Sequence, residues 1–337
     1  MQTSSSEHRL YKENSSSTSN INSNLLRVLK KQKYQIIGNH SAVKKCRWLH
    51  MSLVEGRSCY KSKFYGIKSH RCIQFTPSAI WCTQSCLHCW RIQTGESNLS
   101  WDESTSEIWD TPSKIVDLAI ASQKKILSGY KSQVLSGKIK SDVYQEALKP
   151  KHVAISLAGE PTLYPDLGAL ISEFHSLGMT TFLVTNGTRP DVLKNLSDEP
   201  TQLYISLSAS RSERYHEICK PQSKKYWKKL LETLNLLKSF NCPSAIRLTL
   251  VKGLNLEDPQ GYAKLISKAD PTYIEPKAYM YIGYSRRRLT FENMPTYKQV
   301  REFSLKLAES TGYRIIDDSV QSRVALLSKL EKPIKVC

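Results

Sequence analysis

The sequence lacks any apolar run that approaches the roughly 20 residues of a membrane-spanning helix. Its N-terminus also lacks the positively charged start and apolar stretch that mark a secretory signal peptide. Without an export signal, its nine cysteines do not indicate a disulfide-stabilised secreted domain. We therefore expect a cytoplasmic protein that does not bind membranes and whose cysteines stay reduced.

Acidic residues are scarce relative to basic ones, because 30 Asp and Glu stand against 49 Lys and Arg, a formal net charge of +19. Such a surplus favours a polyanionic partner, since each phosphate that pairs with Lys or Arg releases bound counterions. The basic residues include the run Arg286, Arg287 and Arg288. We expect this run to contact nucleic acid.

Large apolar side chains are almost absent from residues 1–20, which are rich in Ser, Asn and Thr. Such a segment buries too little surface to offset the entropy of ordering, so a disordered tail is predicted over residues 1–23. An amphipathic helix is predicted from Asn24 onward. The units expected after the tail are a cysteine-bearing N-terminal extension (24–72), an α/β core (73–295) and a C-terminal extension (296–337).

Three cysteines, Cys82, Cys86 and Cys89, follow an apolar stretch with the spacing C-x3-C-x2-C. Three thiolates can hold three irons of a [4Fe–4S] cluster and leave the fourth iron open, whereas electron-transfer ferredoxins use four cysteines. The spacing resembles the signature of radical S-adenosylmethionine (SAM) enzymes, in which the open iron binds SAM and the reduced cluster releases a 5′-deoxyadenosyl radical. We therefore predict a [4Fe–4S] cluster and SAM as cofactors.

Cys46, Cys59 and Cys72 form a second trio with the spacing C-x12-C-x12-C. Zinc fingers take their ligands as close pairs, which this spacing lacks, so a second [4Fe–4S] cluster is the favoured interpretation. The alternative is a zinc site made of the first trio with Cys72 or His88, because zinc also binds thiolates. The other cysteines, expected to be ordinary buried or terminal thiols, are Cys219, Cys242 and Cys337.

Short β-branched runs alternate with helical patterns beyond Arg71. Parallel strands need crossover helices, so this alternation predicts an incomplete (β/α)6 TIM-like barrel with additions at both ends. Thr111 followed by Pro112 marks one helix start as an N-cap. Strands are expected at 73–80, 152–157, 181–185, 203–207, 245–251 and 273–281, and helices at 112–127, 166–177, 190–196, 224–240 and 258–267.

Polar residues follow the predicted strands at the end where parallel barrels carry their active groups. In radical SAM folds, a segment such as Gly159-Glu160 lets the backbone approach the amino group of SAM. Asn186 ends the next strand, and Ser206 and Ser208 end the one after it. Gly-Glu-Pro and Asn-Gly are also common turns when they stand alone. Their positions at successive strand ends predict SAM contacts at all five residues.

Several longer segments match the pattern of one family. They are Cys59-Tyr-Lys-Ser-Lys-Phe-Tyr-Gly, His70-Arg71-Cys72, Trp90-Arg91, His152-Val-Ala-Ile-Ser-Leu-Ala-Gly-Glu-Pro, Arg247-Leu-Thr-Leu-Val-Lys-Gly and Gly283-Tyr-Ser-Arg. With both cysteine trios in this order, the chain resembles the archaeal 4-demethylwyosine synthases, radical SAM enzymes of wybutosine biosynthesis. The resemblance runs from Cys46 to about Asp318. Relatives commonly have Asp where this chain has Ser208, so an ionic contact does not carry over, although a hydroxyl can still form a hydrogen bond.

The resemblance implies a radical SAM carbon–carbon lyase that acts on tRNA. Its substrate would be tRNA-Phe with N1-methylguanosine at position 37. The N1-methyl group would lose a hydrogen to the adenosyl radical, and the resulting carbon radical would add to pyruvate. The third ring of 4-demethylwyosine would then form with loss of the pyruvate carboxylate, so that two carbons remain on the base. Eukaryotic relatives carry a flavodoxin-like domain with FMN, for which this chain has no room before Cys46. We therefore expect a monomer that takes electrons from an external low-potential donor.

Pyruvate is expected to bind Lys61, which matches the lysine proposed to form a Schiff base in this family. An amine attacks a ketone more readily when desolvation or nearby positive charge lowers its pKa. Lys63 is the rival residue, and direct binding of pyruvate to the open iron of the second cluster is the competing mechanism. The run Arg286–Arg288 is then expected to line the path of an unpaired anticodon-loop base.

Two other functions share parts of this pattern. A different radical SAM modification of RNA, such as methylation or thiomethylation, would use the same first cluster. No C-terminal RNA-binding module of the thiomethylase kind is recognisable, however. A non-catalytic, zinc-stabilised RNA-binding protein would need only the thiols and the positive charge.

Overall fold

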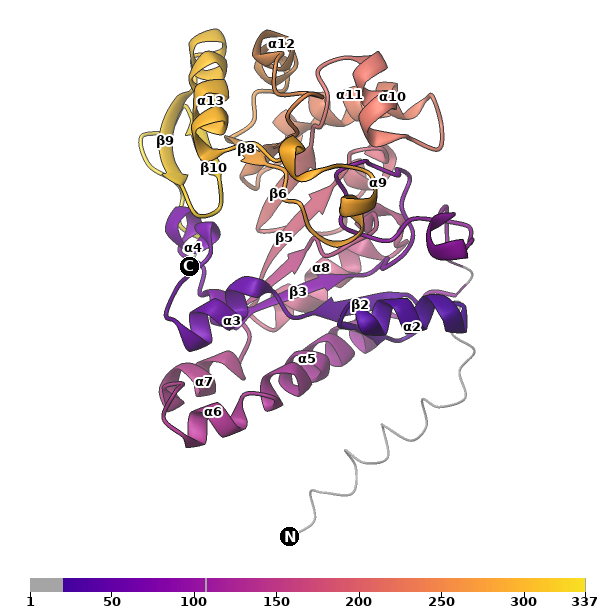
Figure 1. Cartoon of the computed structure of the whole chain (residues 1–337), viewed down its shortest axis with the longest axis vertical. Coiled ribbons are helices and arrows are strands. Elements are labelled where there is room, and N and C mark those ends of the chain that lie inside the picture. The colour runs from indigo at the N-terminus through magenta and orange to yellow at the C-terminus, as the bar shows by residue number, and fades with distance from the viewer. Residues whose placement is uncertain (1–20, 107, 337) are drawn as a thin grey trace.

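The computed structural model describes residues 21–106 and 108–336 of the 337-residue chain. Nearly all of the predicted disordered tail, and all of Cys337, lie outside these residues. The described residues form one ten-stranded sheet in the order β1-β2-β3-β4-β5-β6-β7-β8-β10-β9 (Figure 1). The strands are β1 (Tyr34–Ile37), β2 (Ser41–Lys44), β3 (Cys72–Thr76), β4 (His152–Ile155), β5 (Thr180–Thr185), β6 (Gln202–Ser206), β7 (Ser244–Leu250), β8 (Tyr273–Ala278), β9 (Arg314–Ser319) and β10 (Val324–Ser328).

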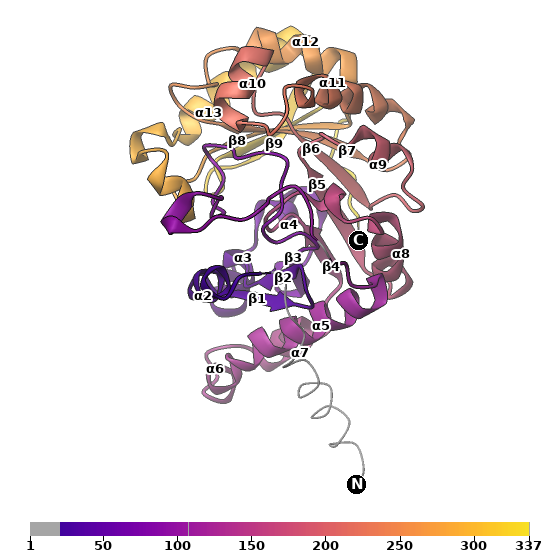
Figure 2. The same ribbon diagram turned by 90° about the vertical axis from the view of Figure 1, so that its right-hand side faces the viewer.

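The strands β3 to β8 are parallel to one another and follow each other in chain order. A helix-containing segment joins each successive pair, as parallel pairing requires. Figure 2 shows α5, α8, α9, α11 and α12 as an outer arc around the strands. The helices are α2 (Ser23–Lys31), α3 (Arg47–Val54), α4 (Tyr60–Tyr65), α5 (Pro112–Ser128), α6 (Lys131–Leu135), α7 (Ser141–Ala147), α8 (Leu167–Ser176), α9 (Pro190–Lys194), α10 (Ser212–Cys219), α11 (Tyr226–Leu236), α12 (Pro259–Ala269) and α13 (Tyr297–Thr311).

The two faces of the sheet pack against different partners. On β6, Leu203 and Ile205 belong to the large apolar core beneath the outer helices. Tyr204 lies between them and packs on the other face with Cys59 and Phe64. This division follows from the two-residue period of a strand, which sends successive side chains to opposite faces. The short helix α4 therefore covers the inner face, and its residues lie among strand residues.

The α/β alternation is confirmed, but both predicted extensions belong to the sheet itself. β1 and β2 form an antiparallel hairpin whose second strand pairs with β3. At the other edge, β10 pairs antiparallel with β8 and with β9. None of these four strands was predicted, because they are short or, like β9 with the sequence RIIDDS, show no apolar alternation. The helices that were also not predicted are α3, α4, α6, α7, α10 and α13.

Some predicted boundaries need correction. The first core strand was expected to reach residue 80 but ends at Thr76, whose hydroxyl accepts a hydrogen bond from the Ser78 amide at 3.1 Å. Thr111 does occupy the N-cap of α5, with Pro112 in its first turn, but the Thr111 side chain makes no capping hydrogen bond. Within the described ranges, no helix combines the length and apolar character needed to cross a bilayer.

Candidate active site

The first cysteine trio lies in the loop that follows β3. Cys82, Cys86 and Cys89 are partly buried free thiols. Burial raises the pKa of Cys82, and the neighbouring Cys86 and Cys89 sulfurs raise it further, so the three thiols lie close to one another. A hydrogen bond with Cys219 raises the pKa of Cys86, which places that buried cysteine beside the trio.

Arg91 is the buried cation of this loop. Its guanidinium pairs with Glu103 at 2.5 Å and donates hydrogen bonds to the carbonyl oxygens of Ile80 at 3.2 Å and Gln84 at 3.2 Å. Its positive charge lowers the pKa of Cys82 and so opposes the effect of burial. Because thiolates are the ligands of iron, a fixed cation beside the trio favours the ligating form.

Arg288 was predicted to contact nucleic acid, but in the structure its side chain is largely buried. Its side chain is only 11% exposed and pairs with Glu96 at 2.5 Å. Its Nε donates to the Leu87 carbonyl oxygen at 3.2 Å, and its Nη2 contacts the carbonyl oxygens of Cys89 and Arg91. Sequence reasoning missed this because nothing in a basic run distinguishes a buried arginine from an exposed one. Arg288 therefore supports the cysteine loop.

Gly159 and Glu160 follow β4 and pack directly against the same loop. Gly159 has φ +69°, and a Cβ there would lie 1.6 Å from the Ser78 carbonyl oxygen, so only glycine fits. The Glu160 amide donates to the Trp81 carbonyl oxygen at 2.8 Å. The buried Glu160 carboxylate accepts from the hydroxyl of Thr185 at 2.6 Å and from the amide of Asn186 at 2.8 Å. Glu160 thus ties the end of β4 to the end of β5.

Asn186 points at the first trio. Its Nδ2 donates to the Thr83 hydroxyl at 2.8 Å and lies 3.8 Å from the Cys82 sulfur. Ser206 lies at the end of the neighbouring strand, one position beyond the register pair of Thr185 with Ile205. Ser208 is buried just after this strand. The structure therefore brings the predicted SAM-binding residues to one edge of the sheet, next to the cysteine loop.

The second cysteine trio comes together from three separate elements. Cys46 is the N-cap of α3, Cys59 is the N-cap of α4, and Cys72 begins β3. Burial raises the pKa of Cys72, and the Cys46 and Cys59 sulfurs raise it further, so all three lie close together. The fold thus assembles residues that are distant in sequence into one thiol site.

The grouping of both trios differs from that of a closed zinc site. In residues 21–106 and 108–336, no three His, Cys, Asp or Glu side chains are grouped for a single metal ion. A structural zinc site surrounds one ion with four ligands, whereas an iron–sulfur cluster takes its thiolates on separate irons. Three soft thiol donors in each group fit a cluster with one open iron.

Lys61 points from α4 toward the inner face of the sheet. It is 8% exposed, and its Nζ lies 4.3 Å from the ring centres of both Phe182 and Tyr204. Burial and the charge of Arg247 lower the pKa of this ammonium to about 8. Burial and the nearby cation therefore favour the neutral amine that a nucleophile requires.

Lys63 is excluded as a rival by its position on the same helix. Its side chain is 55% exposed and its Nζ pairs with Asp317 at 2.6 Å. Two residues along an α-helix correspond to more than half a turn, so Lys61 and Lys63 point to opposite sides. Only Lys61 faces the inner side of the sheet.

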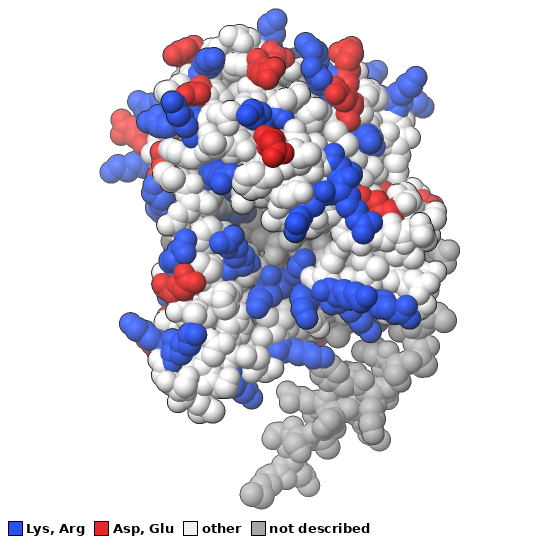
Figure 3. Space-filling model, viewed as in Figure 1, with Lys and Arg blue, Asp and Glu red and all other residues white. Residues whose placement is uncertain are grey.

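Arg286 and Arg287 remain available on the surface. They belong to a 3-10 helix (Gly283–Arg287) and are exposed. Figure 3 shows Lys and Arg gathered around a central hollow on the face seen in Figure 1, with a further row along α2. The exposed basic residues of α2 include Lys30 and Lys31 in its last turn. This face is suited to a phosphate backbone.

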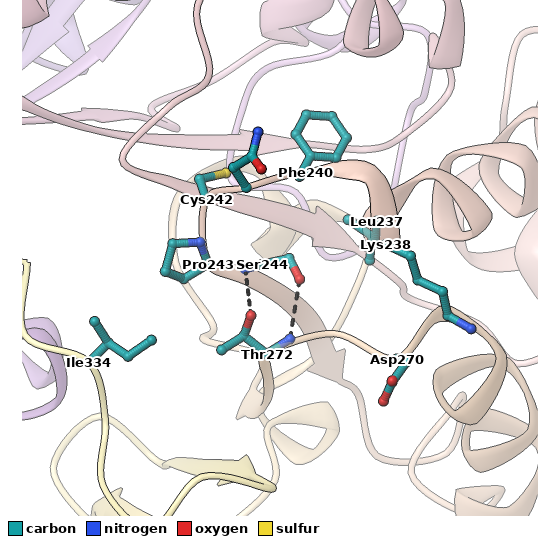
Figure 4. A pocket seen from close by; sticks show the side chains of 10 residues that line it. Leu237, Lys238, Phe240, Cys242, Pro243, Ser244, Asp270, Thr272 and Ile334 are labelled. Carbon is teal, nitrogen blue, oxygen red and sulfur yellow. Dashed lines mark hydrogen bonds between the residues drawn. The ribbon is translucent and has the colours of Figure 1, made fainter.

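A separate cavity of about 420 Å³ opens at the other end of the strands (Figure 4). It lies before β7 and β8, where the amide groups and hydroxyls of Ser244 and Thr272 exchange hydrogen bonds at 3.1 and 3.2 Å. Cys242 lines it and is partly buried. Because it opens at the N-terminal strand ends, this cavity is remote from the predicted SAM-binding edge.

The fold and the cysteine loop define a radical SAM protein. The family model for the Radical SAM superfamily matches residues 77–266, and the model for wyosine base formation matches residues 268–329. The chain is 47% identical over 306 residues to the S-adenosyl-L-methionine-dependent tRNA 4-demethylwyosine synthase of Pyrococcus abyssi, with 90% of this chain and 87% of the relative covered. The chain therefore belongs to the tRNA 4-demethylwyosine synthase family, and its radical SAM assignment implies SAM and one [4Fe–4S] cluster.

Two further comparisons agree. The synthase of Methanocaldococcus jannaschii is 44% identical over 310 residues, covering 92% of this chain and 97% of the relative. A solved structure of TYW1 with a lysine–pyruvate adduct bound has a TM-score of 0.83 and 41% identity, covering 94% of this chain and 99% of that one. The boundary between the two family models falls inside α12, before the last parallel strand, so it is not a structural boundary.

Proposed function

We propose that this protein condenses pyruvate with N1-methylguanosine-37 of tRNA-Phe to form 4-demethylwyosine, as a radical SAM carbon–carbon lyase. The observation that carries the proposal is the Lys61 amine, which is buried beside the second thiol site and rests against two aromatic rings. A related TYW1 structure holds a lysine–pyruvate adduct, and Lys61 is the residue of this chain best suited to form one.

The cofactors are assigned to the two thiol sites. Cys82, Cys86 and Cys89 would hold the cluster that binds SAM, and the second trio would hold another [4Fe–4S] cluster. When bound and reduced, SAM and its cluster supply a 5′-deoxyadenosyl radical, which takes a hydrogen from the N1-methyl group. The proximity of the thiols supports this assignment, because the sulfurs of each trio act on one another's pKa.

SAM would lie along the edge formed by the ends of β4, β5 and β6. Gly159 would let the backbone approach the amino group, and Asn186, Ser206 and Ser208 would offer hydrogen bonds. Glu160 has a different task from the others, because its carboxylate already accepts hydrogen bonds from Thr185 and Asn186. We infer that it positions the loop that binds SAM.

Lys61 would hold pyruvate as an imine. The neutral amine adds to the keto carbon, the oxygen leaves as water, and the Nζ–carbon double bond keeps the three carbons in place. Holding both reactants in one water-poor space lowers the entropic cost of their reaction. Direct binding of pyruvate to the open iron of the second cluster is the alternative, and it needs no amine at residue 61.

The tRNA would approach the basic face around the central hollow. Arg286 and Arg287 are exposed, so they can pair with phosphates of the anticodon loop. We propose that the protein acts as a cytoplasmic monomer with an external low-potential electron donor. We also assign residues 73–295 to an incomplete (β/α)6 barrel, with 24–72 and 296–337 as extensions whose strands lengthen its sheet and 1–23 as a tail.

The decisive experiment incubates reduced, anaerobically reconstituted protein with SAM, pyruvate and methylguanosine-containing tRNA and then measures nucleoside masses. The 4-demethylwyosine nucleoside is expected. Borohydride added with pyruvate alone should reduce the imine and attach it to Lys61. Lys61→Gln should abolish this adduct and the product, whereas the exposed control Lys63→Gln should retain both. Full product formation by Lys61→Gln, with no adduct on the normal protein, would favour binding to iron instead.

A further inference from the structure

The space around Lys61 on the inner face of the sheet is lined by charged side chains. Arg247 on β7 and Lys277 on β8 face it together with Lys61, and the buried Glu275 is their shared carboxylate. Arg247 pairs with Glu275 at 2.7 Å. The Cys59 sulfur, when ionised, is a further negative group near both lysines, and the Lys277 side chain is partly exposed, so an anion can reach its ammonium.

Glu275 is already saturated by other donors. Its Oε2 accepts from Arg247 and, at 3.3 Å, from the Tyr60 hydroxyl. Its Oε1 accepts from the hydroxyls of Tyr65 at 2.6 Å and Tyr204 at 3.1 Å. Burial raises the pKa of this carboxyl, but Arg247 and Lys61 hold it below its usual value, so the group is an anion. Among the described residues, the hydrogen bonds that Glu275 accepts come from Arg247 and three tyrosines and not from either lysine.

Lys277 faces the same space around Lys61 from strand β8. Arg247 is in register with Glu275, and Thr249 is in register with Lys277, so all the odd-numbered residues of this pair of strands point to one face. The Lys277 Nζ lies 4.9 Å from the ring centre of Tyr60, the residue that precedes Lys61. It donates one hydrogen bond, to the Ser322 carbonyl oxygen at 2.7 Å, and an ammonium has two more protons to donate.

We propose that Lys277 binds the carboxylate of the 2-keto acid whose keto carbon is attached to Lys61. The inference rests on the proposed function and extends it, because it assigns recognition of the acid group to a residue that nothing else identifies. A 2-keto acid presents its carboxylate on the carbon next to the keto group. The Lys277 ammonium extends from β8 on the inner face of the sheet, which Lys61 also faces. It can pair with that carboxylate while Lys61 forms the imine.

Selectivity between an acid and its ester provides the test. Reconstituted protein without SAM or reductant is incubated with pyruvate or with methyl pyruvate, which has the same keto group but no charge. Borohydride then traps the imine, and intact-protein mass spectrometry gives the concentration for half-maximal labelling. Half-maximal labelling of the normal protein should require a pyruvate concentration about 10- to 100-fold lower than the methyl pyruvate concentration, as expected for a hydrogen bond to a charged group.

The variants separate recognition from folding. Lys277→Met should raise the concentration of pyruvate needed by about 10-fold or more and leave that of methyl pyruvate unchanged. Lys277→Arg should restore most of the preference, and the control Lys63→Met should behave as the normal protein. If Lys277→Met does not fold, Lys277→Gln and the selectivity of the normal protein decide the question.

The possible outcomes test the role of Lys277 separately from the proposed lyase function. Trapping on Lys61 with equal use of acid and ester would overturn the role of Lys277 and leave the lyase assignment standing. A preference for pyruvate that survives in Lys277→Met would place the carboxylate elsewhere, on Arg247 or on iron. Absence of any trapped adduct in the normal protein would contradict the imine itself.

Discussion

Replacement of Arg288 by Met should damage the cysteine loop and not the tRNA surface. The substitution removes the ion pair with Glu96 and the hydrogen bonds to the carbonyl oxygens of Leu87, Cys89 and Arg91. All of these acceptors lie in the loop that carries the first cysteine trio. Met keeps much of the apolar volume of the side chain, so the loss is mainly electrostatic.

The magnitude follows from the number and kind of bonds lost. Hydrogen bonds to a charged group each contribute about 1.5–3 kcal/mol, but they are not additive, and carbonyls near the surface regain water. We therefore expect a loss of about 3 kcal/mol. For a chain of this length, such a loss lowers Tm by about 4 °C. Iron bound per chain should also fall, because Cys89 is held by one of the lost contacts.

The matched control is Arg286→Met, which removes an exposed arginine two residues earlier in the chain. This change should leave Tm and iron content unchanged and weaken tRNA binding, with a smaller dependence of affinity on salt. Calorimetry, iron analysis and tRNA titration at several salt concentrations measure the three quantities. An Arg288→Met protein with normal Tm and iron but weakened tRNA binding would show that Arg288 contacts RNA.

Other consequences of the structure can be measured directly. Gly159→Ala should prevent the loop from closing on β4, because its Cβ would lie 1.6 Å from the Ser78 carbonyl oxygen at a φ of +69°; loss of soluble, iron-loaded protein is expected, and near-normal iron content would contradict it. Stability should also fall in acid, because burial, followed by the charge of Arg71, lowers the pKa of His152 from 6.5 to about 4. The unfolded chain then binds a proton that the folded chain refuses, so up to about 3 kcal/mol is lost as pH falls from 6.5 to 4. Urea titrations of the normal protein and of His152→Gln across this range should show a flatter profile in the variant.

Local pattern was enough to identify the chemistry of this protein. Three cysteines within eight residues report a cluster loop, because ligands close in sequence are close in space. Alternation of strands and helices, with polar residues at strand ends, placed the SAM-binding edge, since parallel strands bring their carboxyl ends together. Residues such as Gly159 and Asn186 therefore lie where their sequence positions predicted.

Long-range pairing decided the rest. The edge strands β1, β2, β9 and β10 carry little apolar alternation. Their strand conformation depends more on pairing with neighbouring strands than on their own sequence. Charged side chains were likewise ambiguous in sequence. Arg288 and Arg286 stand two residues apart, yet one holds the cysteine loop and the other faces solvent.

The sequence by itself predicted the thiol ligands and determined the α/β class and the basic character, because each is a matter of composition or short spacing. Only the tertiary structure decided which lysine amines lie on the inner face of the sheet. Lys61 and Lys277 are more than 200 residues apart in the chain, yet both lie near Arg247 and the anion Glu275 because α4 packs against the inner face of the sheet. No local pattern encodes that contact, since it depends on the packing of elements that are distant in sequence.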